Sequence, residues 1–549
     1  MDIPNMGVPA DLAARMSMAE QHEYLRSKFS RRGLIRGGAL AAGTVAALPL
    51  LAGTAGAATG GTDSDGPAAA GSPAFLGRPG SGAVNGALVA PYGRHLAFGA
   101  DPSSQFRVAW QTPVPVNRPY LRFGRSPLDL GHKIPAETRA LHTPALTPTG
   151  VAVDQFYHHV AIDHLEPETT YFYGVGHDGF DPAAVQNVGT LGTFTTGPRP
   201  RRHGYDAADP FTFTAFGDQG VSYHALGNDS VILAQNPAFH LHAGDIAYGD
   251  PAGQGLPADS SQYDARTWDS FLFQTESVAK TVPWMVGVGN HDMEAWYSPN
   301  GYGGDVARFD FIANGPDPVN APGIYSFVYG NTAVISLDPN DVSYEIPANF
   351  NITGGSQTRW LEQQLADFRR RSDIDFVVVF FHHCAFSTTN QHASDGGVRD
   401  QWVPLFEQHK VDLVINGHNH VYERTDAILN NAVKKALPAG GTHYPADGGV
   451  VYATAGAAGR SLYSFPVPDS YEGHVSPLDS VATYHWAKGG GKITETVGWS
   501  RARYTGYSFL RVDVTPARPG CATTLKVTAL AESGAQLDHF TIERTAGKH

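Results

Sequence analysis

Five short segments between residues 217 and 420 carry side chains that bind hard or borderline metal ions. In chain order they are Gly217-Asp218-Gln219-Gly220, Gly244-Asp245-Ile246-Ala247-Tyr248, Gly289-Asn290-His291-Asp292, Phe381-His382-His383 and Gly417-His418-Asn419-His420. Each segment follows an apolar run that is predicted to be a strand. Because α/β sheets bind their ligands at the ends of strands, the five segments are expected to converge on one site. Their oxygen and nitrogen atoms, without sulfur, suit iron, zinc or manganese.

The candidate metal ligands outnumber what one first-row ion accepts. They are Asp218, Asp245, Tyr248, Asn290, His382, His418 and His420. The set fits two ions that lie about 3.5–4 Å apart and share a bridging carboxylate, as in two-metal hydrolases. Cys384, close to His382, is an alternative soft ligand that this set of hard ligands disfavours. The sequence therefore predicts a dimetal site of the kind that hydrolyses phosphate esters.

Backbone features of the segments support the same prediction. Glycine precedes a ligand at four places, and a residue without Cβ can turn sharply off a strand end and approach an ion closely. These glycines are Gly217, Gly244, Gly289 and Gly417. His418 and His420 are two residues apart, so an extended segment would place both rings on one face.

Composition limits the partners of the chain. At 549 residues the length predicts two to four domains, and the formal charge of −13 disfavours nucleic acid or an anionic membrane as the main partner. Two cysteines, which we expect to be reduced and buried, cannot form a disulfide framework.

The N-terminus predicts export. Ser30-Arg31-Arg32-Gly33-Leu34-Ile35-Arg36 fits the twin-arginine pattern, and Ala55-Gly56-Ala57 follows a short apolar stretch as a cleavage site. Residues 1–57 are therefore a predicted signal peptide that uses the twin-arginine export machinery and is then removed. A transmembrane anchor is the alternative, but the Gly- and Ala-rich core makes a stable anchor marginal. The mature protein is expected to be extracellular or cell-wall associated.

The mature chain divides into a leader and two predicted domains. Residues 58–88 are a flexible leader. Residues 89–199 are predicted to form a fibronectin-III-like β-sandwich, with strands at 106–112, 120–125, 157–164, 170–175 and 191–196 and a tyrosine-corner motif at 165–173. Residues 208–545 alternate helices at 357–371 and 398–409 with buried strands, which predicts an α/β sandwich. These strands are expected at 211–216, 238–243, 284–288, 333–337, 376–381, 412–415 and 450–453. Ser356 is the expected N-cap of the first helix. The region after Gly459 is expected to be rich in loops, and strands at 507–514, 524–531 and 536–542 to form the second sheet or an extension of it.

The order and spelling of the five segments resemble the purple acid phosphatases, a branch of the dimetal phosphoesterases. Val421-Tyr422-Glu423-Arg424 is also similar to that family. The resemblance covers most of residues 91–545 and implies a metallophosphoesterase catalytic domain, while the twin-arginine signal implies a bacterial, exported protein.

The resemblance also implies a role for each ligand. Asp218, Tyr248 and His420 would bind Fe(III), and Asn290, His382 and His418 would bind a divalent iron, zinc or manganese ion, with Asp245 as the bridge. Tyr248 is then the residue that distinguishes this branch, although a packed aromatic ring is the alternative. His382 is preferred to His383 because the family's ligand follows the strand directly.

Two further histidines complete the expected active site. By resemblance, His291 and His392 contact the substrate phosphate and protonate the leaving alkoxide, while Asp292 and Asp395 tune these histidines or face solvent. The implied function is a secreted acid phosphatase, in which a metal-bound hydroxide attacks a small phosphate monoester. A phosphodiesterase or nucleotidase on the same scaffold is the alternative, and a non-catalytic extracellular binding protein is a third possibility that the full ligand set disfavours.

Overall fold

The structure of the chain is a computed structural model. It describes residues 75–76, 84–146, 151–199, 209–253, 263–294, 297–298, 300–476 and 480–547. The predicted signal peptide 1–57 lies outside these residues, as does most of the predicted leader. Among the described residues, no helix is long and apolar enough to cross a membrane.

The N-terminal part is a β-sandwich, as predicted. A short pair, β1 (Phe75–Leu76) and β2 (Val84–Asn85), precedes it. One antiparallel sheet has the order β3-β4-β8-β7 and the other β10-β9-β5-β6. The strands are β3 (Tyr92–Phe98), β4 (Phe106–Thr112), β5 (Tyr120–Gly124), β6 (His132–Pro135), β7 (Glu137–Thr143), β8 (Val153–Ile162), β9 (Thr170–Gly176) and β10 (Gly192–Thr195).

Side chains from both sheets fill the sandwich core, among them Phe106, Trp110 and Phe194. At the expected corner, the Tyr171 hydroxyl accepts a hydrogen bond from the Glu166 backbone N–H at 3.0 Å. The sequence did not predict β3, β6 or β7. β6 and β7 are mostly exposed, so they lack the apolar alternation that marks a half-buried strand.

The catalytic part contains two seven-stranded sheets between layers of helices. The first has the order β13-β12-β11-β27-β28-β29-β22 and the second β14-β15-β16-β18-β23-β19-β26. The first comprises β11 (Phe211–Phe216), β12 (Phe239–His242), β13 (Trp284–Val286), β22 (Thr442–His443), β27 (Ser508–Thr515), β28 (Ala522–Ala531) and β29 (Gln536–Thr545). The second comprises β14 (Tyr325–Tyr329), β15 (Thr332–Ser336), β16 (Phe376–Phe381), β18 (Leu413–Asn416), β19 (Tyr422–Thr425), β23 (Val451–Ala455) and β26 (Ser500–Tyr504).

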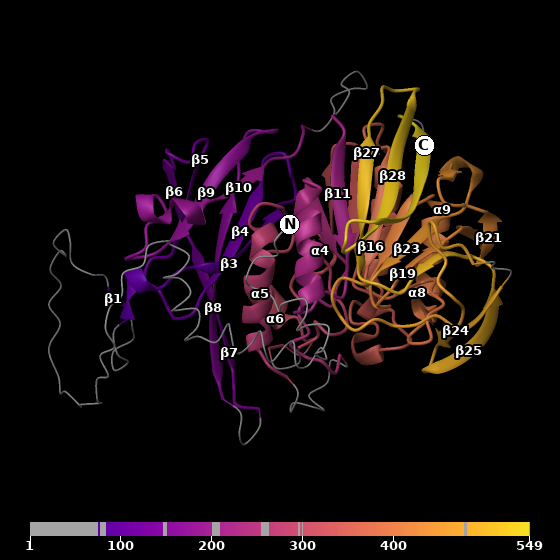
Figure 1. Cartoon of the computed structure of the whole chain (residues 1–549), viewed down its shortest axis with the longest axis horizontal. Helices are drawn as coiled ribbons and strands as arrows, with labels where there is room; N and C mark the ends of the chain where they lie inside the picture. The colour runs from indigo at the N-terminus through magenta and orange to yellow at the C-terminus, as the bar shows by residue number, and fades with distance from the viewer. Residues whose placement is uncertain are drawn as a thin grey trace.

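The C-terminal strands complete the first sheet. Figure 1 shows the yellow strands β27 and β28 beside the magenta strand β11, although almost 300 residues separate β11 from β27 in the chain. β27 pairs antiparallel with β11, whereas β11 pairs parallel with β12. These strands were predicted to form a second sheet or an extension of it. In the structure they belong to the sheet whose strands precede the first three segments.

Helices cover the outer faces of both sheets. α4 (Tyr223–Ala234), α5 (Arg266–Ala279) and α6 (Gly303–Arg308) lie toward the sandwich, and α8 (Gly396–Gln401) and α9 (Val403–Gln408) lie at the far side (Figure 1). α7 (Ser356–Arg370) buries Leu361, Leu365 and Phe368 against the second sheet. Strand β16 is buried along its whole length, which explains its continuous apolar sequence.

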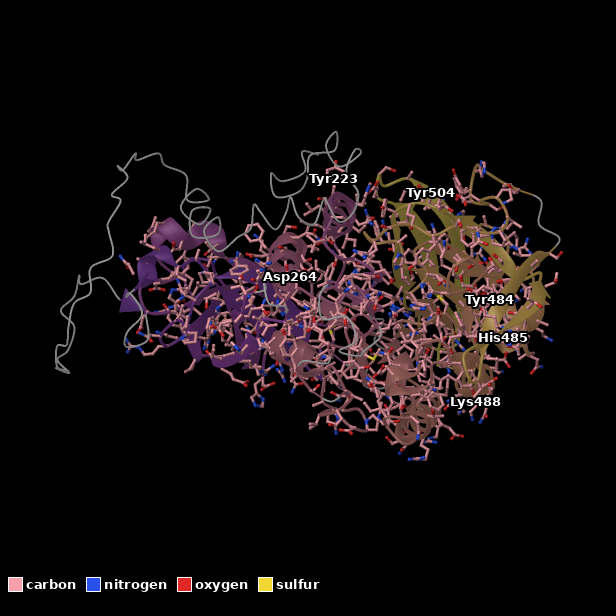
Figure 2. The ribbon with its side chains drawn as sticks, turned by 90° about the horizontal axis from the view of Figure 1, so that it is seen from below. Tyr223, Asp264, Tyr484, His485, Lys488 and Tyr504 are labelled. Carbon is pink, nitrogen blue, oxygen red and sulfur yellow. The ribbon has the colours of Figure 1, made fainter. Side chains whose placement is uncertain are left out.

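Three details correct the expected elements. The N-cap of α7 is Gly355, with φ of +76°, and Ser356 is the first helical residue. The helix predicted over 398–409 is two helices, because Trp402 ends α8 and precedes Pro404 at the start of α9. The region after Gly459 is not only loops, since β24 (Val481–Ala487) and β25 (Gly491–Val497) form a hairpin before β26. Figure 2 labels Tyr484 and His485 on this hairpin, far from the sandwich. Smaller strands are β17 (Ser394–Asp395), β20 (Ala427–Leu429) and β21 (Ala432–Lys435).

A buried ion pair of the catalytic part contacts the sandwich through one hydrogen bond. Arg308 Nη1 lies 2.6 Å from Glu294 Oε2, and neither side chain is exposed. The second Glu294 oxygen accepts a 2.5 Å hydrogen bond from Trp268 Nε1, and the guanidinium lies 4.1 Å from the centre of the Trp268 ring. Arg308 Nε also donates to the Tyr157 hydroxyl of β8, at 3.4 Å. The pair therefore has hydrogen-bond partners in both parts of the chain, although Arg308 Nη2 has none among the described residues.

Candidate metal centre

All five segments meet where the ends of the two sheets come together. Asp218 follows β11, Asp245 and Tyr248 follow β12, and Asn290 follows β13, all in the first sheet. In a second set, His382 follows β16 and His418 follows β18, both in the second sheet. A hydrogen bond joins the two sets, because His418 N donates to Asp218 Oδ2 at 2.8 Å.

Three donor atoms form one close group. The Tyr248 hydroxyl lies 3.0 Å from Asp218 Oδ1 and 3.0 Å from His420 Nε2. His420 Nε2 and Asp218 Oδ1 are 3.3 Å apart, which closes a triangle. These are the three residues that the sequence analysis assigned to the ferric ion.

A second group forms beside the first. His382 Nε2 lies 3.1 Å from Asp245 Oδ2 and 3.2 Å from His418 Nδ1. His382 Nε2 is also 3.9 Å from Asp218 Oδ1, so the two groups are neighbours. Asp245, His382 and His418 are all buried, and their ligand atoms lie within 4.8 Å of one another.

The outer nitrogen of each ring has a fixed partner. His382 Nδ1 donates to Ala243 O at 2.8 Å, His420 Nδ1 donates to Ser461 O at 2.7 Å, and His418 Nε2 donates to Glu345 Oε2 at 3.1 Å. A neutral imidazole has one donor and one acceptor, so the inner nitrogens carry lone pairs. His382 Nε2 and His418 Nδ1 are thus the nitrogens that can offer a lone pair to a cation. A cation between them would replace the proton that Asp245 and Asp218 favour on His382, which is the sense in which these residues fit a metal ion.

The amide of Asn290 supports the same fit. Its Nδ2 donates to Gly253 O at 3.1 Å, whereas its buried Oδ1 has no hydrogen-bond partner among the described residues. A buried carbonyl oxygen without a donor is costly, and coordination to a cation satisfies it.

Burial and charge shift the pKa values of the centre in a consistent way. Burial by itself lowers the pKa of His382, but Asp245 and Asp218 outweigh it and raise the pKa to about 9. Burial together with the charges of Asp218 and Asp245 raises the pKa of the Tyr248 phenol well above its usual value. Two carboxylates and a buried phenol therefore lie close together. Bound cations would lower the pKa of both His382 and Tyr248, because they offset the negative charge of the carboxylates.

The turns at the strand ends are made by the ligands themselves. Asp218, Asp245, Tyr248 and His418 have φ values of +63°, +52°, +59° and +65°. Left-handed backbone at such residues costs about 1–3 kcal/mol each and is concentrated at functional sites. The expectation that the preceding glycines make these turns holds only for Gly244, with φ of +81°.

The other glycines are needed for close approach. A Cβ on Gly417 would lie 2.7 Å from Asp218 Oδ2 and 2.9 Å from His382 Nδ1. The extended conformation expected for residues 418–420 is wrong, because this segment bends, and Asn419 N donates to Gly417 O at 2.7 Å. Tertiary contacts, and not strand alternation, direct the two rings inward.

The two predicted substrate histidines lie at the edge of the centre. His291 Nε2 is 3.8 Å from Asp245 Oδ2, and its Nδ1 donates to Asp250 O at 2.7 Å. His392 Nδ1 donates to Glu345 Oε1 at 2.6 Å, and its Nε2 lies 3.2 Å from the Tyr463 hydroxyl. Both side chains are partly exposed, at 17% and 30%, as contact with a substrate requires.

Neighbouring candidates are placed differently. Both ring nitrogens of buried His383 lack partners among the described residues, and His382 is the one that faces Asp245. The Cys384 thiol donates to Gly417 O at 3.1 Å, and burial raises its pKa, so it does not have the character of a thiolate ligand. Cys521 is exposed, contrary to the expectation that both cysteines are buried.

The two acidic candidates do not face solvent. Asp292 accepts hydrogen bonds from the backbone of Asp245, Ile246 and Gly289 at 2.8–3.0 Å. Burial and the charge of Asp245 raise its pKa to about 7. Asp395 is buried and caps α8. Neither carboxylate contacts His291 or His392 directly.

Sequence reasoning missed three residues that border the centre. Glu345 bonds two histidines, the Tyr463 ring stacks on His420 with centroids 4.0 Å apart, and the Arg460 guanidinium lies 4.1 Å from the Tyr248 ring centre. All three come from loops outside the five segments. A single sequence contains no local signal for them, because they reach the site only through the fold.

Comparison with known proteins agrees with this geometry. Residues 211–422 match the family description "Calcineurin-like phosphoesterase", which defines the class as a metal-dependent phosphoester hydrolase. Residues 91–196 match "Purple acid Phosphatase, N-terminal domain". The chain belongs to the purple acid phosphatase family.

Relatives extend over most of the chain. An uncharacterized protein of Mycobacterium tuberculosis is 32% identical over 497 residues, covering 83% of this chain and 87% of that protein. Purple acid phosphatase 23 of Arabidopsis thaliana is 28% identical over 294 residues, covering 51% of this chain and 60% of that protein. The structure of purple acid phosphatase PPD1 from yellow lupin covers 83% of this chain and 75% of its own, with a TM-score of 0.60 and 19% identity, and so supports the fold.

Proposed function

We propose that this protein is a secreted acid phosphatase that hydrolyses phosphate monoesters at a dinuclear centre of Fe(III) and a divalent ion. The proposal rests on the two neighbouring groups of ligand atoms described above, which meet at carboxylate oxygens. Asp218, Tyr248 and His420 would bind the ferric ion through their mutually close donor atoms. A tyrosine ligand favours the ferric state, which is why the first group is assigned to iron.

The second group would bind the divalent ion. His382, His418 and the Asn290 carbonyl would be its ligands, and Asp245 would bridge the two ions. When bound, the two ions supply positive charge for the phosphate oxygens and activate water as a nucleophile. The absence of thiolate from both groups favours iron, zinc or manganese over softer ions.

His291 and His392 would handle the substrate. His291 keeps Nδ1 on Asp250 O, so its Nε2 is the nitrogen that can exchange a proton with a phosphate or leaving-group oxygen, donating it when the ring is protonated. His392 keeps Nδ1 on Glu345, so its Nε2 is directed to the partly exposed side near Tyr463. Each ring has one nitrogen anchored by the protein, which orients the other for proton transfer or phosphate binding.

The test combines metal analysis with turnover of two matched substrates. Protein exported by a host with a twin-arginine pathway should contain two metal ions, at least one of them iron. It should hydrolyse para-nitrophenyl phosphate faster than bis(para-nitrophenyl) phosphate at acidic pH. Asp245→Asn should remove most of this turnover, while Asp178→Asn, at an exposed ion pair of the sandwich, should not. Faster turnover of the diester would favour a phosphodiesterase, and full activity of Asp245→Asn would contradict the proposal.

Export is tested separately. Replacing Arg31 and Arg32 by lysine should retain the protein inside the cell if the twin-arginine machinery is its partner. Unchanged export of this variant would refute that part of the proposal.

A further inference from the structure

Glu345 contacts two histidines of different function. It lies in the loop between β15 and α7, and its side chain is 8% exposed. Oε1 accepts from His392 at 2.6 Å and Oε2 accepts from His418 at 3.1 Å. We propose that Glu345 is a positioning residue that sets the ring tautomer of both the metal-side His418 and the substrate-side His392. The roles of these two histidines rest on the proposed function.

The chemistry of a carboxylate makes this assignment specific. An ionised carboxylate only accepts hydrogen bonds, so each ring nitrogen that faces Glu345 carries a proton. In a neutral imidazole the other nitrogen then has the lone pair. For His418 that nitrogen is Nδ1, 3.2 Å from His382 Nε2 in the metal centre. For His392 it is Nε2, beside the Tyr463 hydroxyl. One side chain thus determines which nitrogen of each ring is available.

The backbone of Glu345 is held by the loop that carries His392. Asp395, three residues after His392, accepts hydrogen bonds from Ser343 Oγ at 2.7 Å, Tyr344 N at 3.1 Å and Glu345 N at 3.2 Å. The two loops therefore hold each other: Asp395 fixes the Glu345 backbone, and the Glu345 side chain fixes the His392 ring. This explains Asp395 as a residue that acts on the histidine through Glu345.

The hairpin β24–β25 holds the same loop from another side. Trp486 Nε1 donates to His392 O at 2.7 Å, and β17 pairs parallel with β24 through His485 and Trp486. His392 itself has a φ of +57°, a sparsely populated conformation that needs such support. Figure 2 shows where this hairpin lies, through its labelled residues Tyr484 and His485. The backbone of His392 is thus fixed by the hairpin, which leaves Glu345 to fix its ring.

A third cation site is the competing explanation for this cluster. Glu345, His392 and His418 have ligand atoms within 4.8 Å of one another. Two ligands at about 2.1 Å from a tetrahedral ion are about 3.4 Å apart. The 2.6 Å between Glu345 and His392 is shorter than this and fits a direct hydrogen bond. The geometry therefore favours positioning over metal binding.

Glu345→Gln tests the inference with little change of shape. A glutamine side chain has one oxygen acceptor, so one of the two ring N–H groups would face an NH₂ group instead. Metal-free protein is titrated with Zn²⁺ against a chromogenic chelator, and turnover is measured on the reloaded enzyme. Zinc affinity at one of the two sites and kcat should each fall about 10–100-fold, the usual cost of losing a hydrogen-bond partner of a ligand histidine.

Two companion variants separate positioning from general damage. Glu532→Gln alters a Glu–His pair that contains none of the proposed ligands or substrate histidines, in which His224 Nδ1 lies 2.8 Å from Glu532 Oε2, and should leave both quantities unchanged. His392→Gln should lower kcat but keep the zinc affinity of wild type, because His418 retains Glu345. Adding Glu345→Gln to it should lower zinc affinity and cost less in kcat than in the wild-type background. If Glu345→Gln fails to fold, the zinc affinity of His392→Gln still tests the inference. A tenfold loss of zinc affinity in that variant would contradict it.

The failures are distinguishable. An active wild type whose Glu345→Gln variant binds zinc and turns over within twofold of it would overturn this inference alone. A third equivalent of metal in wild type that is lost in the variant would overturn it in favour of the cation site. A wild type that binds no metal and hydrolyses no ester would overturn the proposed function and this inference with it.

Discussion

The buried pair of Arg308 and Glu294 gives a strong test of what stabilises the catalytic part beside its contact with Tyr157 of the sandwich. Arg308→Met removes the guanidinium but keeps most of the side-chain volume. In the variant, Glu294 keeps only the hydrogen bond from Trp268, at a site where neither charged side chain is exposed. A carboxylate deprived of its partner in such a place is strongly destabilised.

The expected loss follows from this environment. Breaking a buried ion pair by removing one partner costs about 3–5 kcal/mol, and the cation–π contact with Trp268 adds up to about 1–2 kcal/mol. We therefore expect Arg308→Met to lower the free energy of unfolding by about 4–7 kcal/mol. The double variant Arg308→Met/Glu294→Gln should recover part of it, because the glutamine oxygen still accepts from Trp268 and no charge stays buried.

Urea unfolding followed by circular dichroism measures both variants. Arg118→Met is the matched control, since Arg118 forms an ion pair with Asp178 at 2.9 Å but is 84% exposed. The urea midpoint of this variant should hardly differ from that of the wild type. A loss below about 1 kcal/mol in Arg308→Met would refute the reasoning. So would a double variant that is less stable than the single one.

Three further predictions concern the centre and the sandwich. Tyr248→Phe should keep two bound metal ions but lose the visible absorption of the iron-loaded enzyme, and an unchanged spectrum would remove Tyr248 from the ligand set. Burial lowers the pKa of His158 to about 3, below its unfolded value of about 6.5, so the stability that it contributes is present above pH 6.5 and is lost as the pH falls toward 3. His158→Gln should therefore reduce the loss of unfolding free energy between pH 7 and pH 5 by about 2 kcal/mol, measured by urea unfolding at both values. Glu423 accepts four hydrogen bonds, from Ser387 Oγ, Thr388 N, Thr388 Oγ1 and Ser500 Oγ at 2.5–2.9 Å. Glu423→Gln should cost about 2 kcal/mol or more in urea unfolding and lower turnover, because this loop leads to His392; equal turnover would contradict the link.

The strands that carry the segments were predictable from sequence because their signal is local. Strands β11 and β16 have the bounds that their apolar runs predict. A strand buried on both faces reads as an uninterrupted apolar run, and a ligand at its end is adjacent in sequence. Exposed strands such as β6 and β7 gave no such signal.

The identity of the donor atoms was also local information, but their arrangement was not. The seven candidate ligands were named from the five segments, and the fold brings six of them into two close groups, while the Asn290 oxygen is buried without a hydrogen-bond partner among the described residues. Sequence spacing suggested strand alternation for His418 and His420, whereas a bend with left-handed His418 orients them. Backbone strain of this kind depends on the surrounding contacts and has no signature in residue type.

What this sequence determined by itself is therefore the inventory of the site: the ligand types, their order, and the strands at whose ends they stand. The tertiary structure alone decided that these strands belong to two sheets, that the C-terminal strands complete the first, and that Glu345 joins His392 to His418. The reason is physical. Apolar periodicity and ligand chemistry act over a few residues, whereas sheet order and hydrogen bonds between loops depend on groups that only folding brings together.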